Sequence, residues 1–159
     1  MDFTEFFRAE HRKLIRFVMT LGVDSDQAAE IAQVTFFKAL QAWGTSRSPR
    51  AWIRRVAVNE LAAARRAARR EAPFASLPDV QMSLSAALAV ELGDEGRRVL
   101  TALATLPPKQ REVMAWIIDG FSATEIAREL GVRPDLVRQN HSKARKNLKR
   151  LYESMRREA

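Results

Sequence analysis

Apolar residues recur three or four positions apart through most of this chain, which is the spacing of one face of an α-helix. No segment shows the alternation of apolar and polar residues that marks a half-buried strand. Three helices are predicted in the first part of the chain, over about 3–21, 25–43 and 49–70. The predicted core stripes are Phe3, Phe7, Leu14, Val18 and Leu21 in the first helix and Ala28, Ala32, Phe36, Ala39 and Trp43 in the second. Asp24 or Ser25 should cap the second helix, and Ser48 the third, which Pro49 opens.

A second group of helices is predicted further along. One carries Val99, Leu100, Leu103 and Leu106 and stops at two prolines, and another should span 109–119. Ser122 and Glu125 then form an S-x-x-E capping box, and Gly131 stands where a left-handed residue ends a helix. Pro134 opens the last helix, which should run to about Arg150. Two helices joined by such a tight turn form a helix-turn-helix, which lays a helix into the DNA major groove. The fold class is therefore predicted to be all-α.

Charge divides the chain into three segments. Residues 1–70 hold 13 Lys and Arg against 7 Asp and Glu, and residues 96–159 hold 14 against 7. Between them, residues 71–95 hold five acidic residues, no basic one and two prolines. This pattern predicts two small basic domains, 1–70 and 96–159, joined by a flexible acidic linker at 71–95. The net charge of +8 indicates a polyanionic partner.

Composition argues against several other classes of protein. The chain has no cysteine, so disulfides and thiolate metal sites are excluded, which suits a cytoplasmic protein. No apolar run is long enough to span a membrane, and the N-terminus lacks the apolar core of a signal peptide. No arrangement of Ser, His and Asp, metal ligands or a phosphate loop is visible, so no catalytic residue, metal or cofactor is expected. His141 falls on the apolar stripe of the last helix and is interpreted as a packed histidine.

The exposed side of the last helix is a candidate DNA-reading surface. Its stripe of Val137, His141, Ala144, Leu148 and Leu151 should face the core. Amide and guanidinium groups near the start of such a helix suit base edges, and cations further along suit phosphates. The candidates for this surface are Arg133, Asp135, Leu136, Arg138, Gln139, Asn140, Lys143 and Lys146. The alternative is a basic helix face that only contacts solvent.

Two further faces are candidate binding surfaces. The third helix combines aromatic and cationic side chains, which stack bases and bind phosphates of single-stranded DNA, in Arg50, Trp52, Arg55, Asn59 and Arg66. A solvated basic face with Trp52 in the core is the alternative, and residue types alone do not separate the two.

The second helix should expose apolar residues among polar ones, a pattern typical of protein docking, in Glu30, Gln33, Val34, Phe37 and Gln41. Here the alternative is that a small domain packs both faces of this helix.

Five segments of the chain, in this order and with these gaps, resemble extracytoplasmic-function (ECF) sigma factors of bacterial RNA polymerase. Residues 26–36 (DQAAEIAQVTF) are similar to a region-two motif, D-x-A-E-D-x-x-Q-E-x-F, and 49–59 (PRAWIRRVAVN) to F-R-x-W-L followed by A-x-N. Residues 106–113, 120–127 and 130–132 resemble region four. The resemblance implies a protein without catalytic activity that binds core polymerase and directs it to promoters, while an anti-sigma factor commonly regulates it.

The resemblance also implies roles for the candidate surfaces. The region-two domain would dock on the clamp helices of the β and β′ subunits through Asp26, Glu30, Gln33, Val34 and Phe37, and its third helix would capture unstacked minus-ten bases. The last helix would read the minus-thirty-five duplex. Val34 replaces the usual glutamate of the docking motif, and the turn at 133–136 departs from the usual S-x-G-T, so no promoter preference follows. From the short segment that follows the last predicted helix, no further regulatory domain is expected. The alternative function is a helix-turn-helix regulator that acts without polymerase.

Overall fold

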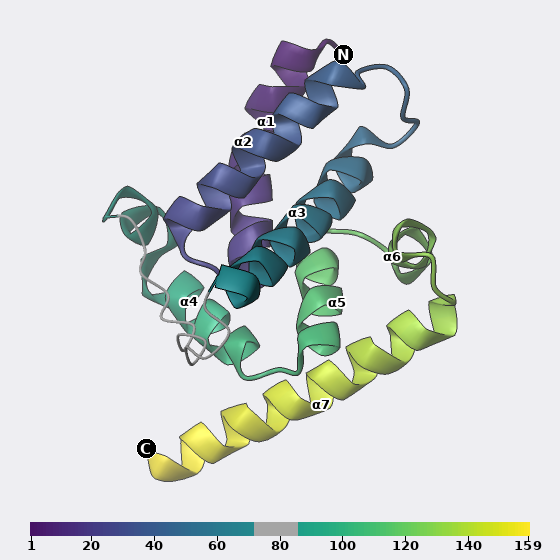
Figure 1. Ribbon diagram of the computed structural model, residues 1–159. Helices are drawn as coiled ribbons and strands as arrows, with labels where there is room; N and C mark the ends of the chain where they lie inside the picture. Colours follow the sequence, from purple (N-terminus) through teal and green to yellow (C-terminus); the bar gives the residue numbers. More distant parts are fainter. Residues whose placement is uncertain (72–85) are drawn as a thin grey trace. The chain divides into compact units, whose positions relative to one another are not determined.

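The computed structural model describes residues 1–71 and 86–159, and all its secondary structure there is helical (Figure 1). The seven helices of these ranges are α1 (Phe3–Thr20), α2 (Ser25–Gln41), α3 (Pro49–Glu71), α4 (Ala86–Ala104), α5 (Pro108–Ile118), α6 (Ala123–Leu130) and α7 (Pro134–Glu158). The predicted all-α class is confirmed. The chain divides into two compact units, residues 1–84 and 85–159. Of the expected linker, residues 72–85 lie outside the described residues, and α4 already begins at Ala86.

The first unit packs α1, α2 and α3 against one another. Asp2 begins α1 with a capping box, because its carboxylate accepts from the backbone N–H of Glu5 over 2.8 Å. Asp24, rather than Ser25, caps α2 by accepting from the backbone N–H of Gln27 over 2.8 Å. Of the two N-cap residues that the sequence allowed for the second helix, the structure therefore uses Asp24.

The aromatic part of this core differs from the predicted stripe. Phe6 is fully buried, whereas the predicted Phe3 and Phe7 are only half-buried, and their rings pack against Trp43 and Phe36 respectively. Trp43 was expected as the last core position of the second helix, but α2 ends at Gln41. Its ring instead lies in the following turn, 5.0 Å from the ring centroid of Phe6. At its far end, α3 is tied to the α1–α2 turn by Arg65, which donates to the backbone oxygen of Leu21 over 2.9 Å.

The second unit contains α4 to α7 and begins with a kinked helix. Gly93 has a φ of 65°, which interrupts α4. A small core of Leu103, Leu106, Met114 and Ala144 joins α4, α5 and α7, with Leu148 packed against it. Trp116 of α5 is fully buried and its ring meets that of Phe121 edge to face, 5.1 Å between centroids. The described residues contain no helix long and apolar enough to cross a membrane.

The helix-turn-helix has the caps that the sequence predicts. Ser122 and Glu125 form both bonds of the capping box, and Gly131 ends α6 in the left-handed conformation. Pro134 is the first residue of α7. The helix does not end near Arg150 as expected but continues to Glu158, because no glycine or proline interrupts it after that residue.

Candidate nucleic-acid interfaces

The start of α7 presents a mixed apolar and charged surface. Asp135 accepts from Arg138 Nη1 over 3.3 Å, and its other oxygen lies 3.7 Å from Arg133 Nη2. Leu136 beside them is exposed, as is Gln139 one turn further on. An exposed amide and guanidinium at the N-terminal end of a helix in this motif can reach base edges, and an exposed leucine can contact a thymine methyl group.

The other residues expected on this surface lie around the same helix. Lys143 and Lys146 are exposed, whereas Asn140 is half-buried on the side of α7 that faces α5. Asn140 shares a cleft of about 230 Å³ with Lys109, Glu112 and Leu136. Burial in this unit raises the pKa of Glu112, while the charge of Lys109 opposes the rise. The structure therefore brings most of the candidates to one exposed side and places Asn140 at its edge.

A second groove on α7 was not identified from the sequence. It has a volume of about 490 Å³ and is lined by Arg138, His141, Ser142, Arg145, Lys146 and Lys149. Four of its residues are cationic, which suits a phosphate backbone. The spacing of 138, 142, 145 and 149 is helical, and this signal was present in the sequence. His141 is half-buried and lines this groove, so it is less enclosed than the predicted core position.

A hydrogen bond between side chains joins α7 to α5. Asn147 Nδ2 donates to Gln110 Oε1 over 2.8 Å. Below it Val137 and Ala144 are fully buried, so the predicted stripe of α7 faces the core along its N-terminal half. The exposed face of α7 is therefore held at a fixed rotation relative to the rest of its unit.

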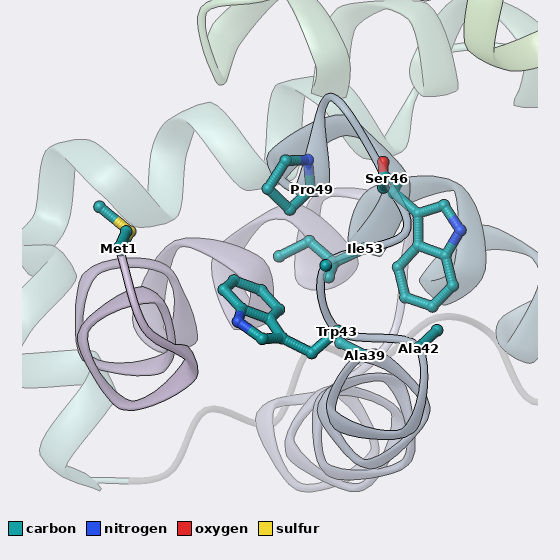
Figure 2. Close-up of a pocket in the computed structure, with 9 residues that line it drawn as sticks. Met1, Ala39, Ala42, Trp43, Ser46, Pro49 and Ile53 are labelled. Carbon is teal, nitrogen blue, oxygen red and sulfur yellow. The ribbon is translucent and has the colours of Figure 1, made fainter.

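In the first unit, a pocket of about 250 Å³ lies between the end of α2 and the start of α3 (Figure 2). Figure 2 shows the side chains of Trp43, Pro49 and Ile53 around the same space. Trp52 also lines it, and the remaining residues are Met1, Ala39, Ala42, Gly44 and Ser46. Two indoles beside an apolar hollow can stack on a base that has left a duplex. The structure places Trp52 half-buried at this pocket, and the sequence offered no sign of the contribution of Met1.

The polar side of α3 continues from this pocket. Arg55, Asn59 and Arg66 are exposed, and their spacing puts them on the same side of the helix as Trp52. Arg50 does not join them, because its Nε donates over 2.9 Å to Glu10 of α1. The structure thus brings together four of the five residues expected to meet the minus-ten DNA. Nothing in the sequence signalled this contact, because Glu10 is a charged residue among the apolar residues of the first helix.

The exposed face of α2 carries three apolar side chains. Val34 is 43% exposed, Phe37 61% and Leu40 52%. Leu40 was not identified from the sequence, although it follows Phe37 by three residues. The polar members of the expected docking surface, Asp26, Glu30, Gln33 and Gln41, are all exposed as well. Large apolar side chains grouped on a polar helix face are typical of a surface that binds another protein.

The fold and these surfaces define a two-domain helical protein whose second domain is a helix-turn-helix. The family model for sigma-70 region 2 matches residues 6–71, and that for sigma-70 region 4 matches residues 96–148. The chain is 32% identical to the ECF RNA polymerase sigma factor SigM of Mycobacterium tuberculosis over 153 residues, which cover 94% of this chain and 76% of that protein. The chain therefore belongs to the ECF group of the sigma-70 family.

Two solved structures share the fold. One is the sigma factor RpoE in complex with the anti-sigma factor NepR from Bartonella quintana, with a TM-score of 0.73 and 23% identity. That match covers 96% of this chain and 97% of the other. The second is CnrH in complex with the cytosolic domain of CnrY, with a TM-score of 0.69, 24% identity, and 96% and 88% of the two chains covered.

Proposed function

We propose that this chain binds core RNA polymerase and directs it to specific promoters, with each task assigned to a separate surface. The observation that carries the proposal is the presence of two DNA-suited surfaces, on α3 and α7, in the same chain as the exposed apolar face of α2. In this proposal the chain catalyses no reaction, since RNA synthesis belongs to the polymerase, and it acts in the cytoplasm where the polymerase works.

The start of α7 reads the minus-thirty-five duplex. Arg138, Gln139 and Leu136 are exposed where a recognition helix contacts base edges. The cationic groove formed by Arg145, Lys149 and their neighbours follows the phosphates. Because the ion pairs of Asp135 with two arginines are exposed, they cost little to break when DNA binds.

The pocket of Trp43 and Trp52 captures a base of the minus-ten element. Removing a base from the stack costs a few kcal/mol, and stacking on aromatic rings returns about 1–3 kcal/mol per base. Arg55, Asn59 and Arg66 extend from the pocket along α3 and bind the strand that carries this base. Because the pocket and this side of α3 bind the single strand rather than the duplex, they favour melting of the minus-ten element.

The exposed face of α2 docks on core polymerase. Val34, Phe37 and Leu40 supply apolar area, and Glu30 with Gln33 supplies a polar rim. A regulator that acts without polymerase does not need a surface that docks on it, so this face favours a sigma factor over that alternative. We also assign an anti-sigma factor as a regulatory partner, in keeping with the family and with the complex in which RpoE was solved.

Run-off transcription tests the proposal. Core polymerase is incubated with the chain and a library of promoter fragments, and the transcribed fragments are selected and sequenced. We expect transcripts from a defined set of promoters that share two elements, and none from core polymerase alone. Tight duplex binding by the chain with no transcript from any fragment would instead support the regulator.

A further inference from the structure

A buried carboxylate of α1 holds the beginning of α3. Glu10 is 3% exposed, and both of its carboxylate oxygens meet arginines of α3. Arg50 Nε donates to Glu10 Oε1 over 2.9 Å, and Arg54 Nη2 lies 2.9 Å from Glu10 Oε2. Arg54 is fully buried, and its Nη1 donates to the backbone oxygen of Arg50 over 2.9 Å. The three residues therefore form one connected network between the two helices.

Such a network is a poor way to gain stability alone. Burying charges is costly, and apolar residues of similar volume often stabilise a protein as much or more. The hydrogen bond from Arg50 Nε to Glu10 Oε1, however, fixes direction as well as distance. The buried Arg54 guanidinium, held by its own bond to the backbone oxygen of Arg50, adds a charge contact with Glu10 Oε2. The network between Glu10 and the two arginines is therefore suited to fixing the rotation of α3 about its own axis.

That rotation decides where Trp52 points. Trp52 lies two residues after Arg50 and two before Arg54, and at 3.6 residues per turn it faces away from both. The two arginines turn toward α1, so Trp52 turns toward the pocket that it lines with Trp43. A change in the rotation of this first part of α3 would move the indole that closes one side of the pocket.

We propose that Glu10 is a positioning residue for base capture, which acts through Arg50 and Arg54 to hold Trp52 at the pocket. This inference rests on the proposed function, since it assigns Glu10 to the minus-ten step. It also separates two roles for Arg50. If Arg50 bound DNA phosphate and Glu10 only competed for it, removing the carboxylate would strengthen DNA binding, whereas loss of positioning weakens it.

The test uses the full chain in complex with core polymerase and a labelled single strand. The strand is the non-template minus-ten segment of a promoter selected by the wild-type complex. For Glu10→Gln we expect about tenfold weaker binding of this strand. The slope of affinity against salt should stay unchanged, because no phosphate contact is lost. Binding of core polymerase and of the minus-thirty-five duplex should also be unchanged well below the melting temperature.

A matched control is Glu60→Gln, which removes a more exposed ion pair between α3 and Lys38 of α2 and should leave strand binding unchanged. Unchanged or tighter strand binding by folded Glu10→Gln would overturn the inference. So would a parallel loss of core binding, because a purely structural role predicts both losses together. A wild-type complex that binds no strand would instead contradict the proposed function itself.

A second variant covers the case in which Glu10→Gln does not fold. The side chain of Arg50 is 46% exposed, so Arg50→Gln removes one arm of the network at less cost to the core. We expect a similar loss of strand affinity with an unchanged salt slope. A slope reduced by about one would assign Arg50 to a phosphate contact and overturn the positioning role.

Discussion

The side chain of Asn147 on α7 donates to that of Gln110 on α5 over 2.8 Å, and this bond lies beside the core that supports the recognition surface. A hydrogen bond of this kind contributes about 0.5–1.5 kcal/mol to stability. A double-mutant cycle with Asn147→Ala and Gln110→Ala should give a coupling energy in this range by urea unfolding. The cycle corrects for the better helix propensity of alanine. A coupling energy of zero would show that the bond does not hold α7 in place.

Single changes on α7 should separate base reading from polymerase binding. Arg138→Ala and Gln139→Ala should each weaken binding of the selected minus-thirty-five duplex by about 1–3 kcal/mol and relax the base preference. Lys146→Ala should weaken all duplexes alike and reduce the salt slope by about one. Core binding should survive each change. Arg97→Ala, at an exposed arginine of α4, is the control and should alter none of these properties.

If the α7 changes abolished binding to core polymerase alone, the assignment of separate tasks to separate surfaces would be wrong.

Changes at the pocket and on α3 should act on strand opening. Trp52→Ala and Asn59→Ala should slow open-complex formation, since stacking on one aromatic ring contributes about 1–3 kcal/mol per base. Stopped-flow fluorescence of a base analogue in the minus-ten element follows this step. Binding of the minus-thirty-five duplex should stay as in the wild type. Wild-type opening rates in Trp52→Ala would show that the pocket captures no base.

The role of the apolar face of α2 in docking can be tested by a substitution there, with an exposed apolar residue of the second unit as the control. Phe37→Ser should weaken binding of core polymerase by more than about 1 kcal/mol, as expected for a large apolar side chain buried in an interface. Because Phe37 is 61% exposed in the free chain, its loss should leave the melting temperature nearly unchanged. Ile118→Ser, at a residue 54% exposed in the second unit, is the control. Equal effects of the two changes would remove the case for docking through α2.

Val34 allows a test in which a charge is added to the docking face of α2. Val34→Glu places the carboxylate that is usual in related docking motifs at a position 43% exposed. If this chain relies on apolar contact there, the variant should bind its core polymerase less tightly, with a stronger dependence on salt. Fluorescence anisotropy of the labelled chain measures both quantities. Tighter binding by Val34→Glu would mean that the site keeps the usual polar contact.

His11 should make the first unit sensitive to acid. Burial and then the charge of Arg12 lower the pKa of His11 below its ordinary 6.5, and its ring packs 4.7 Å from that of Phe7. The unfolded chain therefore takes up this proton at a higher pH than the folded chain does. Stability from neutral His11 is fully present above pH 6.5 and is lost as the pH falls from 6.5 through the folded-state pKa. Urea unfolding above and below pH 6.5 measures this loss, which His11→Gln should reduce.

The sequence predicted features that depend on near neighbours in the chain. The capping box of Ser122 and Glu125 and the left-handed Gly131 were found where their local spacing predicts them. The exposure of Val34 and Phe37 followed from helical spacing alone. These features need no knowledge of tertiary contacts.

Other features depend on residues that only the fold brings together. Glu10 and Arg50 are forty residues apart, and a glutamate in a helix is expected in solvent, so nothing in the sequence signalled their part-buried contact. Phe6, Phe3 and Phe7 are all apolar, and the local pattern could not choose which ring would be fully buried. Leu40 is a different case, because its spacing of three residues from Phe37 was a local signal for the same exposed face, and it could have been identified from the sequence.

The central claim is that the chain opens promoter DNA only together with core polymerase. Its most direct test is the fluorescence of a base analogue in the minus-ten element of a selected promoter. The signal is followed after addition of the chain, of core polymerase, or of both. We predict an increase only with both, and a slower increase in Trp52→Ala while the complex still binds the duplex. Opening by the chain alone, or tight duplex binding without opening when both are present, would contradict the account.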